Sequence, residues 1–393
     1  MRGLLRRWLG VSERRGHELE ALMQSSYQIG GVSVTPETAM RCSTVYACVR
    51  VISESIAQCP CIVYQHIGDE RLRAIDHPLY AMLHDAPNEN QTAFEFFEQI
   101  GVSLNMRGNA YVYMNPNASG VRELIPLQPD QVTPRRSTAG VVTYEVRGDS
   151  GVTTYSQRHI MHVRALSHDG VIGLSPIQQH RETIGLAMTA LDHGTRLFSN
   201  GAKPAGILNV KGRLSDDGRK RLRESWQQGY SGDNVYRTAV LEEDVSWTPV
   251  TMTSEDAQYL ETRKFQRSEI CGIFRVPPHK VGDLERATFS NIEQQSLEFL
   301  TDSLLPWLRR IEQAINKSLL AGTDYYCEFL VDSMLRADIV SRMNAYATAI
   351  NNGIMNRNEV RARENMNPYA GGDQFLVPLN MTTGAGGGDG NSE

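Results

Sequence analysis

The sequence has few cysteines, no long apolar run and no internal repeat. Its 393 residues include six cysteines, and none of them belongs to a CxxC pair. This usage predicts buried free thiols in a reducing cytoplasm rather than a disulfide framework. No stretch approaches the roughly 18 consecutive apolar residues that a membrane-spanning helix needs. The basic N-terminal run "MRGLLRRWLG" lacks the apolar region of a signal peptide and predicts a frayed or packed terminus.

An excess of basic charge is also missing. The 45 acidic side chains outnumber the 40 basic ones, which gives a formal net charge of -5. A protein that coats DNA would normally be basic, so this balance argues against one. It remains compatible with a channel through which DNA passes without sticking. The phosphate-binding pattern GxxxxGK[ST] is absent as well, so the chain is not a P-loop ATPase.

No catalytic or metal-binding group of residues can be assembled from the sequence. His159, His162 and His168 are close together, but positions three apart on a strand face opposite sides of the sheet. The run "GLSP" contains part of a nucleophile elbow, yet Ser175 is better explained as a helix N-cap. We therefore expect no cofactor, no metal and no enzymatic activity.

The first part of the chain, to about Gly173, predicts an α+β domain with a mostly antiparallel sheet. Apolar residues at helical spacing predict helices over 41–58 and 92–106, the second closed by Gly108. Phe94, Phe96 and Phe97 are expected in the core. The strand candidates between turn signals are 61–66, 110–114, 121–127, 141–146 and 160–163.

Next, the sequence predicts two long helices that flank a small α/β insert. Ser175, Pro176 and Gln178 form a helix start, and this helix should run to about Asn200. A polar helix begins at Ser254 and ends before two prolines at 277 and 278. Within the insert, strands are expected over 205–210, 235–241 and 245–250, with a basic helix over 215–229.

The last part of the chain combines a short polar segment with further helices. Residues 279–290 read as a flexible loop, and a capping box over 290–293 should start a long helix that bends at Pro306. A strand over 325–331 and helices over 336–352 and 357–365 follow. The tail 382–393 is rich in glycine and polar residues, which is typical of disorder.

Seven strings of this sequence, in order, resemble the portal proteins (head–tail connectors) of tailed bacteriophages of the Hong Kong ninety-seven type. They are "TVYACVRVISESIAQCPCIVY", "GNAYVY", "GLSPIQ", "NGAKPAGIL", "IFRVPPHKVGD", "SNIEQQ" and "NRNEVRARENMNP". The resemblance implies a portal fold with an α/β wing, two stem helices flanking a clip, a kinked tunnel helix and a short helical crown. The implied divisions are an N-terminal arm 1–33, wing 34–173, stem helices 174–200 and 254–278, clip 201–253, tunnel loop 279–290, kinked helix 291–320, crown 321–381 and tail 382–393.

The resemblance also implies a ring of about twelve copies at one capsid vertex of the virion, assembled in the host cytoplasm. Double-stranded DNA would pass through the ring non-specifically. The implied partners are the large terminase subunit, the major capsid or scaffold protein, and a head–tail adaptor.

Three groups of residues are the candidate sites under this interpretation. The tunnel loop carries mixed charge that would permit transient phosphate contact, at Lys280, Asp283, Glu285 and Arg286. A basic group in the clip would dock an acidic motor or adaptor, or form only a solvated helix face, at Lys211, Arg213, Arg219, Lys220, Arg221 and Arg223. An apolar stripe is expected in the core or at a subunit interface, at Trp307, Leu308, Ile311 and Ile315.

Two alternatives remain at this point. A nuclease or peptidase of head maturation would need clustered acidic metal ligands or a Ser/His/Lys arrangement, which the sequence does not offer. Another ring-forming virion component, such as a head–tail adaptor or a tail baseplate protein, would usually be shorter or richer in β-structure. Such a ring-forming component would also lack an insert flanked by two long helices.

Overall fold

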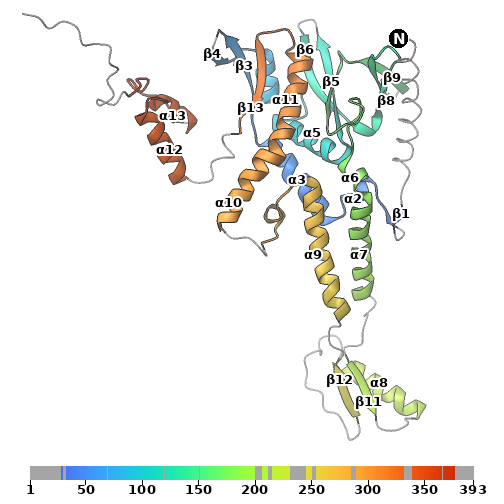
Figure 1. The fold of residues 1–393 in the computed structure, drawn as a ribbon. Coiled ribbons are helices and arrows are strands. Elements are labelled where there is room, and N and C mark those ends of the chain that lie inside the picture. Colours follow the sequence, from blue (N-terminus) through green and yellow to red (C-terminus); the bar gives the residue numbers. More distant parts are fainter. Residues whose placement is uncertain are drawn as a thin grey trace, which may run out of the picture.

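The computed structural model of the chain describes residues 28–29, 32–68, 70–117, 120–149, 151–199, 206–210, 215–230, 245–249, 254–284, 289–331, 339–364 and 366–376. Figure 1 shows a mixed α/β body from which two long helices, α7 (Arg181–Ser199) and α9 (Ser254–Phe274), project side by side. They lead to a small unit of β11, α8 and β12. A further helix pair, α12 and α13, lies beside the body.

Besides α7 and α9, the described part of the chain forms further helices and strands. The other helices are α2 (Pro36–Ala39), α3 (Ser43–Ala57), α4 (Pro78–His84), α5 (Ala93–Arg107), α6 (Pro176–Gln179), α8 (Asp216–Tyr230), α10 (Phe289–Glu298), α11 (Leu305–Leu319), α12 (Ile339–Asn351) and α13 (Arg357–Arg363). The strands are β1 (Gln28–Ile29), β2 (Val32–Ser33), β3 (Cys61–Ile67), β4 (Glu70–Arg73), β5 (Asn109–Asn117), β6 (Gly120–Leu127), β7 (Val132–Arg136), β8 (Val142–Gly148), β9 (Gly151–Ser156), β10 (Ile160–Arg164), β11 (Gly206–Val210), β12 (Val245–Pro249) and β13 (Tyr325–Phe329).

The strands form several small antiparallel sheets instead of the single sheet that the sequence predicted. The three-stranded sheets have the orders β10-β5-β6, β7-β8-β9 and β13-β3-β4, while β1–β2 and β11–β12 are two-stranded. Strands β4 and β9 were not predicted, because their mostly exposed positions lack an apolar alternation, and β7 was missed although Val132 and Pro134 are buried, because the strand contains this proline and two arginines. The predicted strand over 235–241 lies outside the described residues.

Two helices organise the core of the body. The stripe of α3 is buried as predicted, with Val45, Val49, Ile52 and Ile56 each at most 1% exposed. Helix α5 begins with a reciprocal capping box between Thr92 and Glu95 and ends at Gly108, whose φ of 73° is left-handed. Phe96 and Phe97 lie in this core. The expectation for Phe94 was wrong, since this side chain is 42% exposed on the outer face of α5.

All six cysteines are free and buried, as predicted. In the described part of the chain, no helix is long and apolar enough to cross a membrane. The described residues likewise contain no group of three or more His, Cys, Asp or Glu side chains that could hold a metal ion.

Strand β13 corrects one expected boundary. From the sequence, this strand was placed in the expected crown, 321–381, together with the C-terminal helices. Instead it pairs with β3, with Cys327 opposite Val63 and Phe329 opposite Cys61. Both cysteines and Phe329 lie in the core. The chain therefore returns to the body after α11, and the C-terminal helices begin only beyond this strand.

Two predicted helix starts also need correction. The helix that starts at Ser175 is not continuous, because His180 leaves the helical region with φ -112° and ψ 26° and separates α6 from α7. Both helices contact α2, but α6 otherwise packs on α5, whereas α7 packs on α9, β1 and β2, so each helix follows its own main contacts. Helix α10 already includes Phe289, so Ser290 lies inside the helix and cannot supply the extended backbone of an N-cap.

The bend expected at Pro306 takes the form of a π-helical segment, η4 (Phe299–Leu304), between α10 and α11. Proline has no backbone N–H, so a regular α-helical bond to the carbonyl of Asp302 cannot form. Such single π turns often occur where a helix carries a functional distortion. In Figure 1, α10 runs obliquely and α11 more upright on either side of it.

Candidate functional site

The two long helices are the part of the molecule that stands apart from the core. Helix α7 has 19 residues and α9 has 21, which corresponds to about 28 and 31 Å. Their fully buried side chains lie near the body, Ile184 on α7 and Ile270, Cys271 and Phe274 on α9. In contrast, residues 261–265 of α9 are all exposed. A helix that is polar and exposed over much of its surface is typical of an element that bridges solvent or contacts another chain.

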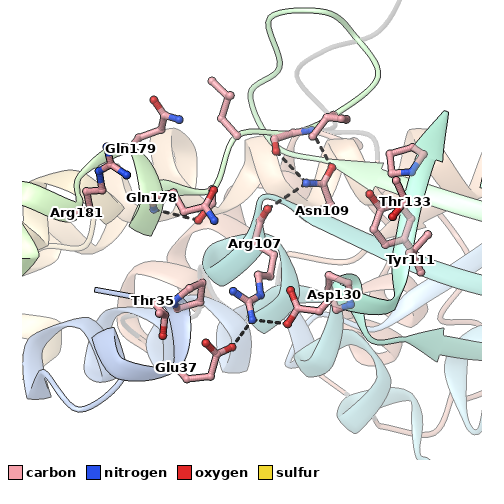
Figure 2. A pocket seen from close by; sticks show the side chains of 18 of the residues that line it. Thr35, Glu37, Arg107, Asn109, Tyr111, Asp130, Thr133, Gln178, Gln179 and Arg181 are labelled. Atoms are coloured by element: carbon pink, nitrogen blue, oxygen red, sulfur yellow. Dashed lines mark hydrogen bonds and ion pairs between the residues drawn. The ribbon is translucent and has the colours of Figure 1, made fainter. Parts of the chain in front are cut away.

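Asn109 joins the body to the start of the first long helix. Its Nδ2 donates to the carbonyl oxygens of Gly173 at 2.8 Å and Arg107 at 3.0 Å. Its Oδ1 accepts from the N–H of Gly173 at 2.7 Å and from Nε2 of His162 at 3.0 Å. The side chain is buried and makes four hydrogen bonds, which is the full capacity of an amide. Figure 2 shows the bonds to Arg107 and Gly173 at the wall of a pocket.

Two glycines permit this close approach. A Cβ at Gly173 would lie 2.0 Å from the carbonyl oxygen of Gly108, and one at Gly108 would lie 2.3 Å from that of Leu174. Ser175 completes the joint, because its hydroxyl donates to the Met106 carbonyl at 2.6 Å and accepts from the Gln178 N–H at 3.2 Å. The predicted N-cap is therefore confirmed, and it also ties α6 to the end of α5.

His162 is buried in this joint in its neutral form. Burial, together with the positive charge of Arg164, lowers the pKa of His162 to about 3. Its Nδ1 lies 3.4 Å from the hydroxyl of Tyr144. The three histidines near residue 160 thus do not act together, since His162 serves the joint and Nδ1 of His159 lies 3.2 Å from Oγ of Ser156.

A cavity of about 440 Å³ lies against the joint. Arg107 is 17% exposed at its side chain and pairs with Glu37 on α2 and with Asp130 in η1 (Pro129–Gln131). Figure 2 shows its guanidinium between the two carboxylates, while Gln178, Gln179 and Arg181 lie on the opposite side. The arginine therefore links three separate segments at the base of the long helices. Neither the ion pairs of Arg107 nor the hydrogen bonds of Asn109 to Gly173 were predicted from the sequence, although "GNAYVY" and "GLSPIQ" contain Asn109 and Gly173.

The second long helix ends in a joint of its own. Arg275, which follows α9, has φ 55°, and it is the only non-glycine residue with positive φ in the described part of the chain. Its guanidinium donates to the carbonyl of Asp302 at 3.3 Å, and its own carbonyl accepts from Ser303 Oγ at 2.6 Å. Asp302 is the residue whose regular helical donor would be Pro306. The arginine thus supplies a donor at the point where proline has removed one.

The segment expected to be a flexible loop begins as an ordered turn. Residues Pro278–Val281 form a short 3-10 helix, η3, that ends at the left-handed Gly282. His279 Nδ1 lies 2.9 Å from Gln295 Oε1, and Lys280 Nζ lies 5.8 Å from the ring centre of Phe299. Asp283 pairs with Arg267 on α9 at 3.5 Å. Asp283 is thus attached to α9 and Lys280 lies against η4, while Glu285 and Arg286 lie outside the described residues.

The basic group of the insert is only partly described. Arg219, Lys220 and Arg221 are exposed on α8, and Arg219 lies 3.7 Å from Asp216. Arg223 is one turn beyond Arg219 on the same helix, which places its backbone on the same face. Lys211 and Arg213 lie outside the described residues.

The apolar stripe of α11 lies inside the chain. Leu308, Ile311 and Ile315 are at most 1% exposed, and Trp307 packs against the same core while partly buried. Glu312, on the same helix, is 5% exposed and accepts from the N–H of Phe329 at 2.8 Å. These contacts fix α11 to β13 and to the rest of the body.

Comparison with known proteins identifies relatives over most of the chain. A family model described as phage portal protein matches residues 43–365. A probable portal protein of Streptomyces phage phiC31 is 34% identical over 382 residues, which cover 91% of this chain and 83% of that protein. The portal protein of Enterobacteria phage HK97 is 33% identical over 372 residues, covering 92% of this chain and 87% of the relative.

A solved structure shares the fold. A chain in the neck of an empty gene transfer agent particle aligns with a TM-score of 0.66 at 23% identity. The alignment covers 89% of this chain and 99% of that chain. The family model, the two portal proteins that align over most of this chain and the shared fold all point to the same family. The chain belongs to the phage portal protein family.

Proposed function

We propose that the chain is a structural portal subunit, which assembles into a ring at one capsid vertex and forms the channel for packaging and ejecting double-stranded DNA. The observation that carries this proposal is the pair of exposed helices, α7 and α9, that projects from a folded body and ends in a small unit. In a closed ring, such helices would line the passage with one face and contact neighbouring copies with another.

The proposed roles follow the order of the described elements. The body with its three-stranded sheets would be the wing, α7 and α9 the stem, and β11, α8 and β12 the clip. The connection after α9 would be the tunnel loop, the α10–η4–α11 helix the kinked tunnel helix, and α12 with α13 a short crown. The joints at Asn109 and Arg275 would then transmit force between the stem and the body.

The charge of the chain supports passage of DNA without tight binding. The net charge is -5, and the described start of the tunnel loop combines Lys280 with Asp283. Each fixed phosphate contact would add an energetic barrier to movement, because it exchanges counterions. Lys280 and Arg286 would contact phosphates transiently, while Asp283 and Glu285 would keep this attraction weak.

The insert at the far end of the stem is the proposed docking surface for the large terminase subunit and the head–tail adaptor. Basic residues of α8 would attract an acidic partner surface. We expect the double variant Arg219→Glu and Arg223→Glu to slow terminase binding, as measured with purified rings. Binding at the wild-type rate would remove this assignment and leave α8 as a solvated helix.

The proposal is tested by electron microscopy of the purified protein, combined with native mass spectrometry of the same sample. Rings of about twelve copies with a central opening are the expected result. A compact monomer or dimer over a wide concentration range would overturn the portal assignment. An additional metal-dependent nuclease assay should give no activity.

A further inference from the structure

The last two helices that the structure describes form a small unit in which several large apolar side chains are exposed. We define the C-terminal unit as α12, α13 and residues 366–376. Among its described side chains, those that are buried are the polar Asn356 and Asn358. The unit exposes large hydrophobic side chains at Met343, Ile354, Met366, Tyr369 and Phe375.

Polar contacts hold this unit together. Arg342 pairs with Glu364 at 2.8 Å, with both side chains less than 20% exposed. Asn358 bonds to the Tyr369 carbonyl at 3.0 Å and to Asp373 at 2.9 Å. These contacts all join residues of the C-terminal unit, and Figure 1 shows the unit standing apart from the body. A unit this small without an apolar core needs another surface for stability.

The body carries a second uncovered apolar patch, on β3 and β4. The register pairs Ile67 with Glu70 and Gln65 with Leu72, so these four residues share one face of the sheet. Ile67 and Leu72 are each 50% exposed, and Ile75, just after β4, is 65% exposed. On the opposite face of the same sheet, His66 stacks on Tyr326 of the neighbouring strand β13 at 4.5 Å.

The two patches have complementary charge at their margins. Glu70 and Asp76 are exposed beside the β3–β4 patch. The C-terminal unit presents Arg357, within 3.5 Å of the Tyr369 hydroxyl, and Arg361, which donates to the Asn367 carbonyl at 2.7 Å. These partners are neutral and leave the arginine charges uncompensated.

We propose that the C-terminal unit of one copy docks on the β3–β4 patch of the next copy. The inference rests on the proposed ring and names one of its contacts. Two different patches on one chain make a head-to-tail contact, which is the kind that closes a ring. An apolar centre with a charged margin is also the usual composition of a specific interface. The contact would bury Ile354 and Phe375 of one copy against Ile67 and Leu72 of its neighbour.

Cysteine cross-linking of the full chain tests this contact. All six native cysteines are buried, so the double variant Leu72→Cys and Ile354→Cys adds the two exposed thiols. Under a mild thiol oxidant, assembled rings should give a ladder of covalent multimers on a denaturing gel. The matched control, Val152→Cys with Ile354→Cys, places the first thiol on β9 and should stay monomeric on the gel.

Several outcomes would overturn the contact. A cross-link within single chains would show that the unit docks on its own body, and rings without cross-links would show that it docks elsewhere. Both results would leave the ring itself intact. If the wild-type chain forms no rings, the proposed function fails first, and the two failures are thereby distinguished.

Charge reversal provides a second test. Glu70→Arg and Arg357→Glu should each raise the subunit concentration needed for half-maximal ring assembly about fivefold, because each places like charges at the contact. Combining the two variants should recover most of the loss. Asp149→Arg, at an exposed position beside β8, is the control and should assemble like the wild type. If the effects of the two substitutions on this concentration simply add in the double variant, Glu70 and Arg357 do not face each other at the contact.

Discussion

At the scale of single residues, the joint below α7 depends on the absence of a side chain at position 173. Gly173→Ala should destabilise the protein by about 2–4 kcal/mol, because its Cβ would overlap the Gly108 carbonyl and force the backbone apart. Denaturant unfolding at one fixed subunit concentration measures this change.

Gly272→Ala is the matched control for this substitution. It lies in α9, and a Cβ there would meet no atom within 4 Å. This variant should be neutral or more stable by up to about 1 kcal/mol, because alanine favours the helix. If both substitutions change the free energy of unfolding equally, the close approach of Gly173 to the Gly108 carbonyl does not require a glycine.

His162 makes the stability of the same joint depend on pH. Its folded pKa is about 3, below the ordinary value of 6.5. Between these values the unfolded chain binds a proton that the folded chain excludes, so stability is full above pH 6.5 and falls as the pH decreases. The loss should reach about 2 kcal/mol between pH 6.5 and pH 5.

Comparison with His162→Gln isolates this contribution from other titrating groups. Glutamine keeps an amide donor for Asn109 but does not titrate in this range. The difference between the two unfolding free energies should therefore shrink as the pH falls from 6.5 to 5. Parallel pH profiles would indicate that the imidazole is protonated in the folded protein.

At the scale of elements, the joint between α9 and η4 links a left-handed arginine to a proline-containing helix. Arg275→Gly keeps the φ of 55° without strain but removes the guanidinium bond to Asp302. It should cost about 1 kcal/mol in the native sequence. In a Pro306→Ala background, residue 306 regains an N–H that can reach Asp302, so the same substitution should cost less.

A double-mutant cycle over these two positions gives the coupling energy directly. Unfolding free energies of the two single variants and the double variant are needed, with Arg275→Ala as the control for strain. Alanine should be worse than glycine by about 1 kcal/mol, because it has a Cβ in the left-handed region. A coupling energy near zero would mean that the arginine does not compensate for the proline.

Local signals in the sequence predicted most of the helices but fewer of the strands. Caps are encoded within four residues, so Gly108 and Ser175 act as expected. Strand β9 is exposed and depends on its pairing with β8, which no local pattern carries. The break at His180 depends on different packing partners for α6 and α7, and this information is also not local.

For the candidate site, the sequence predicted where the helices and the insert lie along the chain, but not which residues contact one another. The two long helices and the insert are visible from caps, prolines and helical spacing. The links made by Asn109 and Arg107 join residues more than twenty positions apart, as with Asp130 and Gly173. Such contacts follow from the tertiary fold, and although Asn109 and Gly173 belong to the strings that carry the family resemblance, Arg107 and Asp130 do not.

At the scale of the whole molecule, two described parts of the chain project from the body, and both are called excursions here. The first excursion consists of α7, the insert and α9, and the second is the C-terminal unit. Between them, β13 returns to pair with β3 and brings Cys327 and Phe329 into the core. The body can therefore fold around a continuous centre while both excursions remain free for contacts with other copies. Exposed apolar side chains occur on both projecting parts and also on the body, where Ile67 and Leu72 belong to the β3–β4 patch.

The final prediction concerns DNA passing through the assembled ring. Lys280→Ala combined with Arg286→Ala should weaken binding of double-stranded DNA and lower the slope of log affinity against log salt concentration by about 2. Lys280 is exposed beside Phe299 at the start of the proposed tunnel loop. Binding of a DNA duplex to purified rings, titrated over a series of salt concentrations, measures this slope.

Lys317→Ala, on the exposed side of α11, removes one positive charge away from the proposed tunnel loop and should leave the slope unchanged. Particles assembled with the double variant should also retain less packaged DNA. If slope and retention both match the wild type, the phosphate contacts of this loop are dispensable. Passage of DNA would then depend on the width of the channel and on its acidic balance, since a channel of negative potential needs no fixed cation to keep the duplex moving.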